Sequence, residues 1–402
     1  IDVESTQNGA LDIGGANAGS SVFLNTGGSV QAGSVTAGDT LAIGDRIAAS
    51  DITLTGDVDV ASMTAQTLGL FTAQSTIDAR QSANINSADI DLADGSALSA
   101  TSVTLRVSST GDVIIGDGTE SYVLGNVELD RIAASDLIVD AGTNNVRVDA
   151  IVFADNTGSD NVIIASGGNI SLTDDITADG VGRTFRFGGS ADPDTNAFAT
   201  RITGAADDAN FDFGAATVVL RGEDIVFGRD GFIADVEGRS ITDISGSLVA
   251  NSASSLYNPI LEGLLSDARL ANPVYLRAGN LVVAYENSAL FQNFGVASDD
   301  ATQTLGVTIG TANNPGTLTL DTTGDDNAFA LFGQVNELTG ETAALAGPNI
   351  IITNERTQLG NSRINGCQIG SGADCVAVQV GIISTLDLPR ENVDLLSVDN
   401  EL

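Results

Sequence analysis

The chain of 402 residues contains no lysine, no histidine and no tryptophan. Its 16 basic residues, all arginine, face 53 acidic residues, so the formal net charge is −37. Nucleic acid is therefore excluded as a partner on charge grounds, because proteins bind phosphate backbones mainly through clustered Lys and Arg. The same charge leaves no basic patch for an anionic membrane surface. Uninterrupted apolar runs of about 18 residues, which a membrane-spanning helix requires, are also absent.

The lack of His and Lys weighs against catalysis. These residues are among the usual general bases, and a serine nucleophile would have no His to activate it. Acidic doublets could serve a glycosidase, but adjacent acids on a strand point to opposite faces, so each doublet supplies at most one wall of a site. We predict that the protein is not an enzyme and keep a carbohydrate-active β-helix as the weakest alternative. The doublets are Asp174–Asp175, Asp207–Asp208, Asp299–Asp300 and Asp325–Asp326.

Aromatic residues and proline are scarce, at 4% and six residues, whereas hydrophobic residues reach 42% and there are 46 glycines. The apolar content is Val, Ile, Leu and Ala, which stack well in a narrow core whose layers repeat about every 4.8 Å. Short β-favouring runs alternate apolar and polar residues between turns rich in Gly, Asp and Asn. Such runs include 21–24, 52–54, 103–107, 113–115, 146–152, 162–164, 217–220, 305–309, 318–320, 328–332 and 350–352.

The heptapeptide Asp-Arg-Ile-Ala-Ala-Ser-Asp occurs at 45–51 and again 85 residues later (130 minus 45), at 130–136. This offset is about four times the roughly 20 to 22 residues that one coil with three short strands needs. The repeat therefore predicts an all-β fold, a right-handed parallel β-helix, with the two copies at equivalent corners four coils apart. We expect Ile47 and Ile132 to point inward and Arg46 and Arg131 to point outward.

The pattern divides the chain into four parts. Residues 1–250 read as β-helix repeats, 251–300 as a transition or flank, 301–360 as further coils or a cap, and 361–402 as a cysteine loop with an acidic tail. Within the flank, the spacing of Leu256, Ile260 and Leu264 predicts a short helix or loop insertion near 254–270. The aromatic residues of the flank either fill the junction with the coils or form a platform for sugar or protein ligands. They are Tyr257, Tyr275, Tyr285, Phe291 and Phe294.

The only two cysteines, Cys367 and Cys375, lie in one Gly-rich stretch, Ile-Asn-Gly-Cys-Gln-Ile-Gly-Ser-Gly-Ala-Asp-Cys-Val at 364–376. Their spacing allows an unstrained disulfide, and an even, close pair suits an oxidising exterior. Two thiols without His cannot complete a zinc site, so we predict no metal site and no cofactor. Loosely bound calcium at turns such as 155–161 stays open. The pair is either a local anchor or a staple for the last coil.

Together, the β runs, the repeated heptapeptide and the near-terminal cysteine pair resemble bacterial exoproteins of the filamentous haemagglutinin type, which are exported by two-partner secretion. The resemblance implies that Cys367 and Cys375 form a hook that holds the protein in its outer-membrane transporter. No family-type secretion domain is recognisable from Ile1 onward, and the chain opens without an initiator Met. We therefore expect it to be a processed, C-terminal part of a longer exoprotein.

The resemblance also implies a function: a secreted adhesin or fibre stalk, anchored at the outer membrane and displayed on the cell surface. Its partners would be the transporter and, outside the cell, polysaccharide, other cells or identical chains, as in cell adhesion and biofilm formation. The alternative is an extracellular matrix protein that associates with itself, in which the cysteine pair is only a cap.

Overall fold

The computed structural model describes residues 1–5, 8–119, 121–153, 160–178, 182–191, 197–204, 210–227 and 275–291, and short strand segments between 306 and 395. The chain forms two compact units, which we treat separately. Unit 1 comprises residues 1–168 and 183–196, and unit 2 comprises 169–182 and 197–402. Both units consist mainly of parallel β-structure, and the one helix in the described part is α1 (Asn126–Asp130).

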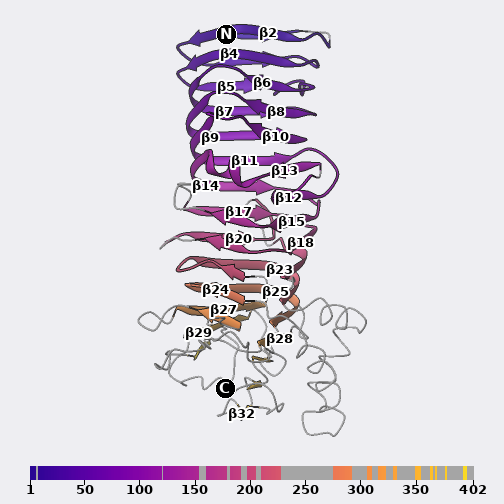
Figure 1. The fold of residues 1–402 in the computed structure, drawn as a ribbon, viewed down its shortest axis with the longest axis vertical. Coiled ribbons are helices and arrows are strands. Elements are labelled where there is room, and N and C mark those ends of the chain that lie inside the picture. The colour runs from indigo at the N-terminus through magenta and orange to yellow at the C-terminus, as the bar shows by residue number, and fades with distance from the viewer. Residues whose placement is uncertain are drawn as a thin grey trace. The chain divides into compact units, whose positions relative to one another are not determined.

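Unit 1 is wound into coils whose strands stack one above another (Figure 1), and the pairing registers divide these strands into three parallel ladders. Ladder 1 contains β1 (Asp2–Glu4), β3 (Val22–Asn25), β5 (Thr40–Ile43), the second halves of β7 (Val58–Gln66), β9 (Thr76–Ser87), β11 (Ala97–Val107) and β14 (Ile132–Asp140), and then β17 (Asn161–Ala165) and β20 (Thr184–Phe187).

Ladder 2 contains the first halves of β2 (Leu11–Ala18) and β4 (Val30–Ala37), followed by β6 (Ile52–Leu54), β8 (Leu70–Ala73), β10 (Asp89–Leu92), β13 (Tyr122–Leu124), β12 (Val113–Gly116) and β15 (Val146–Asp149). Ladder 3 contains the second halves of β2 and β4 and the first halves of β7, β9, β11 and β14. The short strand β16 (Ile151–Phe153) follows β15.

The coils up to β11 are regular. Partner residues are 19 to 23 positions apart, from Leu11 with Val30 to Val35 with Val58. On ladder 1 the inward column runs from Leu24 through Ile43, Ala65 and Ile85 to Leu105, and none of these side chains is more than 1% exposed. Successive side chains of a strand point to opposite faces, so every second residue of each strand points into the core. Burial of each Leu, Ile or Val contributes about 1.5–3 kcal/mol.

The corner from ladder 1 to ladder 2 is closed by a buried hydroxyl. Thr26 Oγ1 donates to the Gly9 carbonyl of the previous coil, at 2.6 Å, and accepts the Gly28 N–H. Thr67 makes the same two kinds of bond, with Ala49 and Gly69, and Ser166 makes them with Asn144 and Gly168. A Ser or Thr two residues before a Gly is therefore the local signal for this corner.

The two copies of the heptapeptide adopt different structures, which corrects the prediction of equivalent corners. Residues 45–51 form a loop after β5, where Gly44 turns the chain at φ +74°. In this loop Ile47 is 41% exposed, not inward as predicted, and Ala49 is the buried residue. Residues 130–136 pass from α1 into β14, where Ile132 is buried as predicted. Ile132 pairs with Leu98, a position that the loop at 45–51 does not share.

Unit 2 contains three sets of parallel strands. One set comprises β18 (Asn169–Leu172), β21 (Ala199–Gly204), the second halves of β23 (Thr217–Phe227) and β25 (Asn280–Phe291), and β28 (Phe329–Phe332). The second set comprises β19 (Ile176–Ala178), β22 (Asn210–Asp212), β24 (Tyr275–Ala278) and β26 (Gly306–Ile309). The first halves of β23 and β25, with β27 (Thr317–Thr322), β29 (Asn349–Asn354) and β33 (Val393–Leu395), form the third.

Two features of unit 2 bear on the predicted domain plan. Residues 275–291, predicted to be part of a flank, form β24 and β25, because Leu281, Val283 and Tyr285 alternate inward in the register of the preceding coil. The predicted insertion at 254–270 lies outside the described residues. A small antiparallel sheet consists of β30 (Arg363–Ile364), β31 (Cys367–Gln368) and β32 (Val376–Ala377), and it includes Cys367.

Candidate functional site

The predicted cysteine site is described only in part. Cys367 lies in β31, where its backbone pairs with Ala377 across an antiparallel bridge. Its side chain and the whole of Cys375 lie outside the described residues. Strand β31 pairs antiparallel with β30 and β32, unlike the parallel strands of the coils.

The predicted aromatic platform does not form a described surface. Tyr257 and Phe294 lie outside the described residues, and of Tyr275 and Phe291 only the backbone, in β24 and β25, is described. Tyr285 is fully buried. Its ring therefore packs in the core of unit 2 and is not available to a ligand at the surface.

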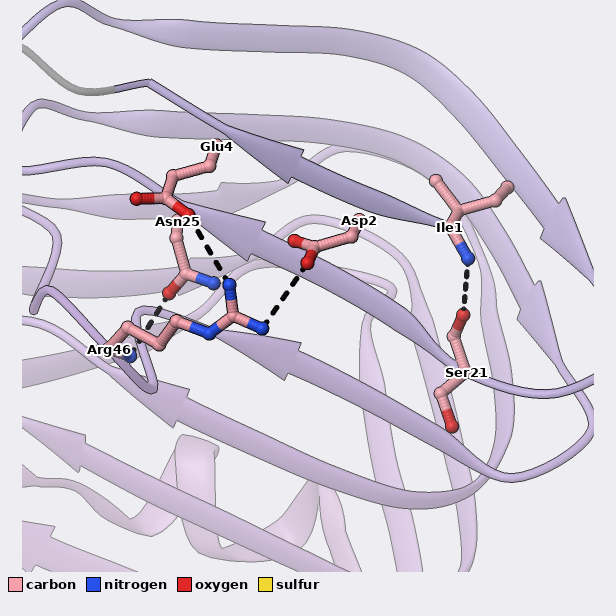
Figure 2. Close-up of polar contacts among 6 residues, drawn as sticks. All are labelled: Ile1, Asp2, Glu4, Ser21, Asn25 and Arg46. Carbon is pink, nitrogen blue, oxygen red and sulfur yellow. Dashed lines mark hydrogen bonds and ion pairs between the residues drawn. The ribbon is translucent and has the colours of Figure 1, made fainter.

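The outer surface of unit 1 is crossed by arginine–carboxylate pairs that join one coil to another. Figure 2 shows Arg46, which bonds Asp2 Oδ2 at 3.2 Å and Glu4 Oε2 at 3.3 Å, while its backbone N–H donates to Asn25 Oδ1. The Asp2 carboxylate raises the pKa of Arg46. Arg80 binds Asp59 at 2.7 Å, and Arg106 binds Asp140 at 2.9 Å. These pairs offset like charges that stacking would otherwise bring together, such as Asp59 and Asp78, which are register partners.

One coil departs from the regular pattern. We call residues 107–131 the wide coil, because partners on either side of it, such as Leu98 and Ile132, are 34 positions apart (132 minus 98). Within it the chain forms β12, turns back and adds β13, which pairs in parallel with β12, Val113 opposite Tyr122. The opposite edge of β12 pairs with β15, and β13 contacts β10. Strand β13 thus lies between β10 and β12 although it follows both in sequence.

Side chains replace ladder hydrogen bonds around the wide coil. The Val123 N–H donates to the carboxylate of Asp89, and the Leu92 carbonyl accepts from the guanidinium of Arg131, which also binds Asp94. Arg131 was predicted to point outward like Arg46, but its side chain is only 18% exposed because it crosses to β10.

Asn126 is the third residue whose side chain replaces ladder hydrogen bonds. Its side-chain amide donates to the Ala150 carbonyl at 2.9 Å and accepts the Val152 N–H at 3.0 Å. These two groups flank Ile151, and a residue of a parallel strand would bind the same two groups. The amide also bonds the carbonyl of Ala150, whose φ of +48° is the one left-handed conformation of a non-glycine residue in the described part.

Next to the wide coil, the pKa values of two side chains, Asp89 and Tyr122, are shifted. Asp89 is half-buried, and loss of hydration raises the pKa of its carboxyl group, an effect that its bonds to the Val123 and Ile90 amides oppose. Tyr122 is fully buried, and its hydroxyl has no hydrogen-bond partner among the described residues. Burial, and secondarily the nearby Asp89 charge, raises the pKa of Tyr122, so the phenol is neutral at physiological pH.

The acidic doublet that the structure describes has a structural role. Asp174 accepts the N–H of Asp175, and Asp175 accepts the N–H of Asn210 in the next coil of unit 2. Both carboxylates therefore close turns. Over the described ranges, no three Asp, Glu or Cys side chains are grouped to hold a metal ion. No helix there is long and apolar enough to cross a membrane.

The sequence analysis did not predict the wide coil or the three side chains that replace ladder hydrogen bonds around it, those of Asp89, Asn126 and Arg131. The available signals were the longer interval between β runs after Val113–Ile115 and the isolated position of Tyr122, far from the other three tyrosines. A scan of the chain against protein-family models, a search of curated proteins and a search of solved structures each found no match.

Proposed function

We propose that the protein is a right-handed parallel β-helix that serves as the stalk of a secreted bacterial surface adhesin. Its role is mechanical and adhesive, not catalytic. The observation that supports this proposal is the coil-on-coil stacking of unit 1, where the same parallel ladders continue through successive turns. Each coil rests on its neighbours, so such a stack can lengthen without a larger core.

The surface of unit 1 suits a role outside the cell. Its net charge favours solubility and opposes sideways association of coils, and the described arginines that pair across coils leave no open cationic patch between Asp2 and Asp140. An exposed β-edge invites aggregation unless charge or covering structure blocks it. The stacked acids would keep neighbouring stalks apart.

Retention at the cell is the second part of the proposal. Cys367 and Cys375 would form a disulfide loop that holds the chain in an outer-membrane two-partner-secretion transporter, and the stalk would face other cells, a polysaccharide or a surface. The antiparallel pairing of β31 with β30 and β32 supports this assignment, because it differs from the parallel pairing of the coils.

The test compares cells that secrete the full-length exoprotein through its transporter, as wild type or as Cys367→Ser. We expect the wild-type protein to remain on the cells and the variant to appear in the medium, with loss of attachment to a surface. Ser371→Ala, in the same loop, is the matched control and should stay on the cells. If Cys367→Ser protein is retained as well as wild type, the anchor is refuted and the cysteine pair is a cap of a self-associating fibre.

A further inference from the structure

The outer surface of ladder 1 carries no carboxylate over three successive coils, at the second halves of β7, β9 and β11. The inward positions of these segments, from Met63 to Leu105, are buried, so the residues between them face outward. We call the uncharged outward residues of these segments the neutral face. They are Ser62, Thr64, Gln66, Ser82, Asn84, Asn86, Ser102 and Thr104.

The surfaces around the neutral face are acidic. On ladder 3 of the same strands, Asp59 and Asp78 are register partners. On ladder 2, Asp91 faces outward from β10. Carboxylates return on ladder 1 itself at β14, where Asp136 lies opposite Ser102. In a chain with 53 acidic residues, the neutral face is therefore a distinct, uncharged area of polar side chains.

The side chains of the neutral face are not engaged with one another or with their surroundings. Among the residues that the structure describes, none of these eight side chains has a hydrogen-bond partner. Exposed hydroxyl groups elsewhere on unit 1 bond between coils: Ser20 donates to Asp39 at 2.7 Å, and Thr101 donates to the Arg80 carbonyl at 2.9 Å. The hydroxyl groups of the neutral face are thus left for solvent or a ligand.

The neutral face is arranged as a regular grid. Its register is unshifted from the pair Ser62–Ser82 to the pair Gln66–Asn86, and the same columns continue at Ser102. Neighbouring strands of a sheet lie about 4.8 Å apart, and alternate residues of one strand lie about 6.6 Å apart. Hydrogen-bonding groups therefore repeat in two directions across the face.

Charge and side-chain chemistry limit what this face can bind. A polyanion is repelled by a chain whose formal net charge is −37, and a cationic partner is attracted to the acidic ladders instead. Protein partners bind mainly through large aromatic or Arg anchors. Over the described ranges, the exposed large hydrophobic side chains all lie outside the neutral face. An uncharged ligand that is rich in hydroxyl groups satisfies all of these conditions.

We propose that the neutral face binds a neutral polysaccharide, through hydrogen bonds between its side chains and the hydroxyl groups of successive sugars. Each such bond contributes little in water, but a polymer engages several of them at once, which raises the overall affinity. This assignment rests on the proposed adhesive function and adds to it the class of partner and the residues that contact it.

Electrophoresis of the purified whole chain in native gels tests the proposal. The gels contain dextran, galactomannan or xyloglucan, which are neutral, or polygalacturonate, which is acidic. The chain migrates by its own negative charge, so a bound neutral polymer slows it. Relative to a gel without polysaccharide, we expect slower migration in at least one neutral gel and unchanged migration with polygalacturonate.

Substitutions in the central column of the neutral face locate the binding. In the combined variant Thr64→Ala, Asn84→Ala and Thr104→Ala, the dissociation constant should rise at least about tenfold, because several hydrogen bonds to the sugar are lost. A second variant, Thr64→Val with Thr104→Val, keeps the branched shape that strands favour and removes only the two hydroxyl groups. It should also bind more weakly than the wild type.

The matched control is a column of similar side chains on another face. Gln31, Thr53 and Thr72 are register partners that face outward on ladder 2, next to Asp91. Replacement of these three residues by Ala should leave the dissociation constant unchanged. Circular dichroism checks that the coils are intact in every variant.

Three results would overturn the proposal: unchanged migration in all three neutral gels, equal weakening by the ladder 2 control, or full binding by both variants of the neutral face. These measurements need neither the transporter nor Cys367. A chain that stays on cells but binds none of the glycans refutes the role of the neutral face and leaves the anchored stalk. Glycan binding by a chain whose Cys367→Ser variant also stays on cells refutes the anchor and leaves the neutral face.

Discussion

The regular coils between β3 and β11 and the wide coil between β11 and β14 satisfy their backbone groups in different ways. In the regular coils each strand is bound by the next at an interval of 19 to 23 residues, and side chains outside the core contribute exposed ion pairs. At the wide coil, Asp89, Asn126 and Arg131 bind backbone groups that a strand binds elsewhere. Around the inserted strand β13, particular side chains therefore complete the hydrogen bonds.

This comparison predicts where substitutions cost most. In the regular coils the largest loss should come from the core. Phe71→Ala in β8 removes a fully buried ring between Ile52 and Ile90, its partners in the coils on either side. We expect a loss of about 3–5 kcal/mol in the free energy of unfolding, as for other buried aromatic residues. Denaturant titration of the purified chain measures it. Thr72→Ala, at the neighbouring outward position, is the control and should change stability by far less.

In the wide coil we expect the largest loss of stability from a polar residue, Asn126. Asn126→Ala leaves the Ala150 carbonyl and the Val152 N–H without the amide that binds them. We expect a loss of about 1–3 kcal/mol, the cost of leaving a partly buried hydrogen-bonding group unpaired. The same titration applies, with the exposed Asn84→Ala of β9 as the matched variant. Equal small effects of the two substitutions would show that the Asn126 amide does not replace a strand.

The smallest effect should come from the surface of the regular coils. Arg80 and Asp59 form a 2.7 Å ion pair, but both side chains are about half exposed. We expect Arg80→Ala to cost about 0–1 kcal/mol, because solvent screens such pairs, and the loss should shrink as salt is added. A loss as large as that of Asn126→Ala would erase the distinction between the two regions.

Most of the strand pattern was predictable, because inward and outward residues alternate locally. The runs at 52–54, 113–115, 162–164 and 217–220 all lie in strands. The run at 146–152 is two strands, β15 and β16, since Ala150 breaks it in a left-handed conformation. No local pattern predicts a positive φ at alanine. The carbonyl of Ala150 accepts a hydrogen bond from Asn126, 24 residues earlier in the chain.

The repeated heptapeptide was the strongest sequence signal and led to a wrong detail. Residues 45–51 form a loop after Gly44, whereas residues 130–136 run from the end of α1 into β14. The structure of the heptapeptide therefore depends on the coil in which it lies. Arg46 and Arg131 accordingly differ: one pairs with acids at the surface, and the other crosses to a carbonyl of β10. Both contacts join residues about 40 positions apart, and local spacing carries no information about them.

The cross-coil ion pairs of unit 1 have a consequence for alkaline conditions. Each of their cations is a guanidinium group, a type of side chain that stays charged in proteins, and the chain has no lysine ammonium group. The pairs that join Arg46, Arg80 and Arg106 to neighbouring coils therefore persist across the alkaline range. Because the chain has no lysine, formaldehyde and amine-directed labels find no lysine side chain on this surface with which to react.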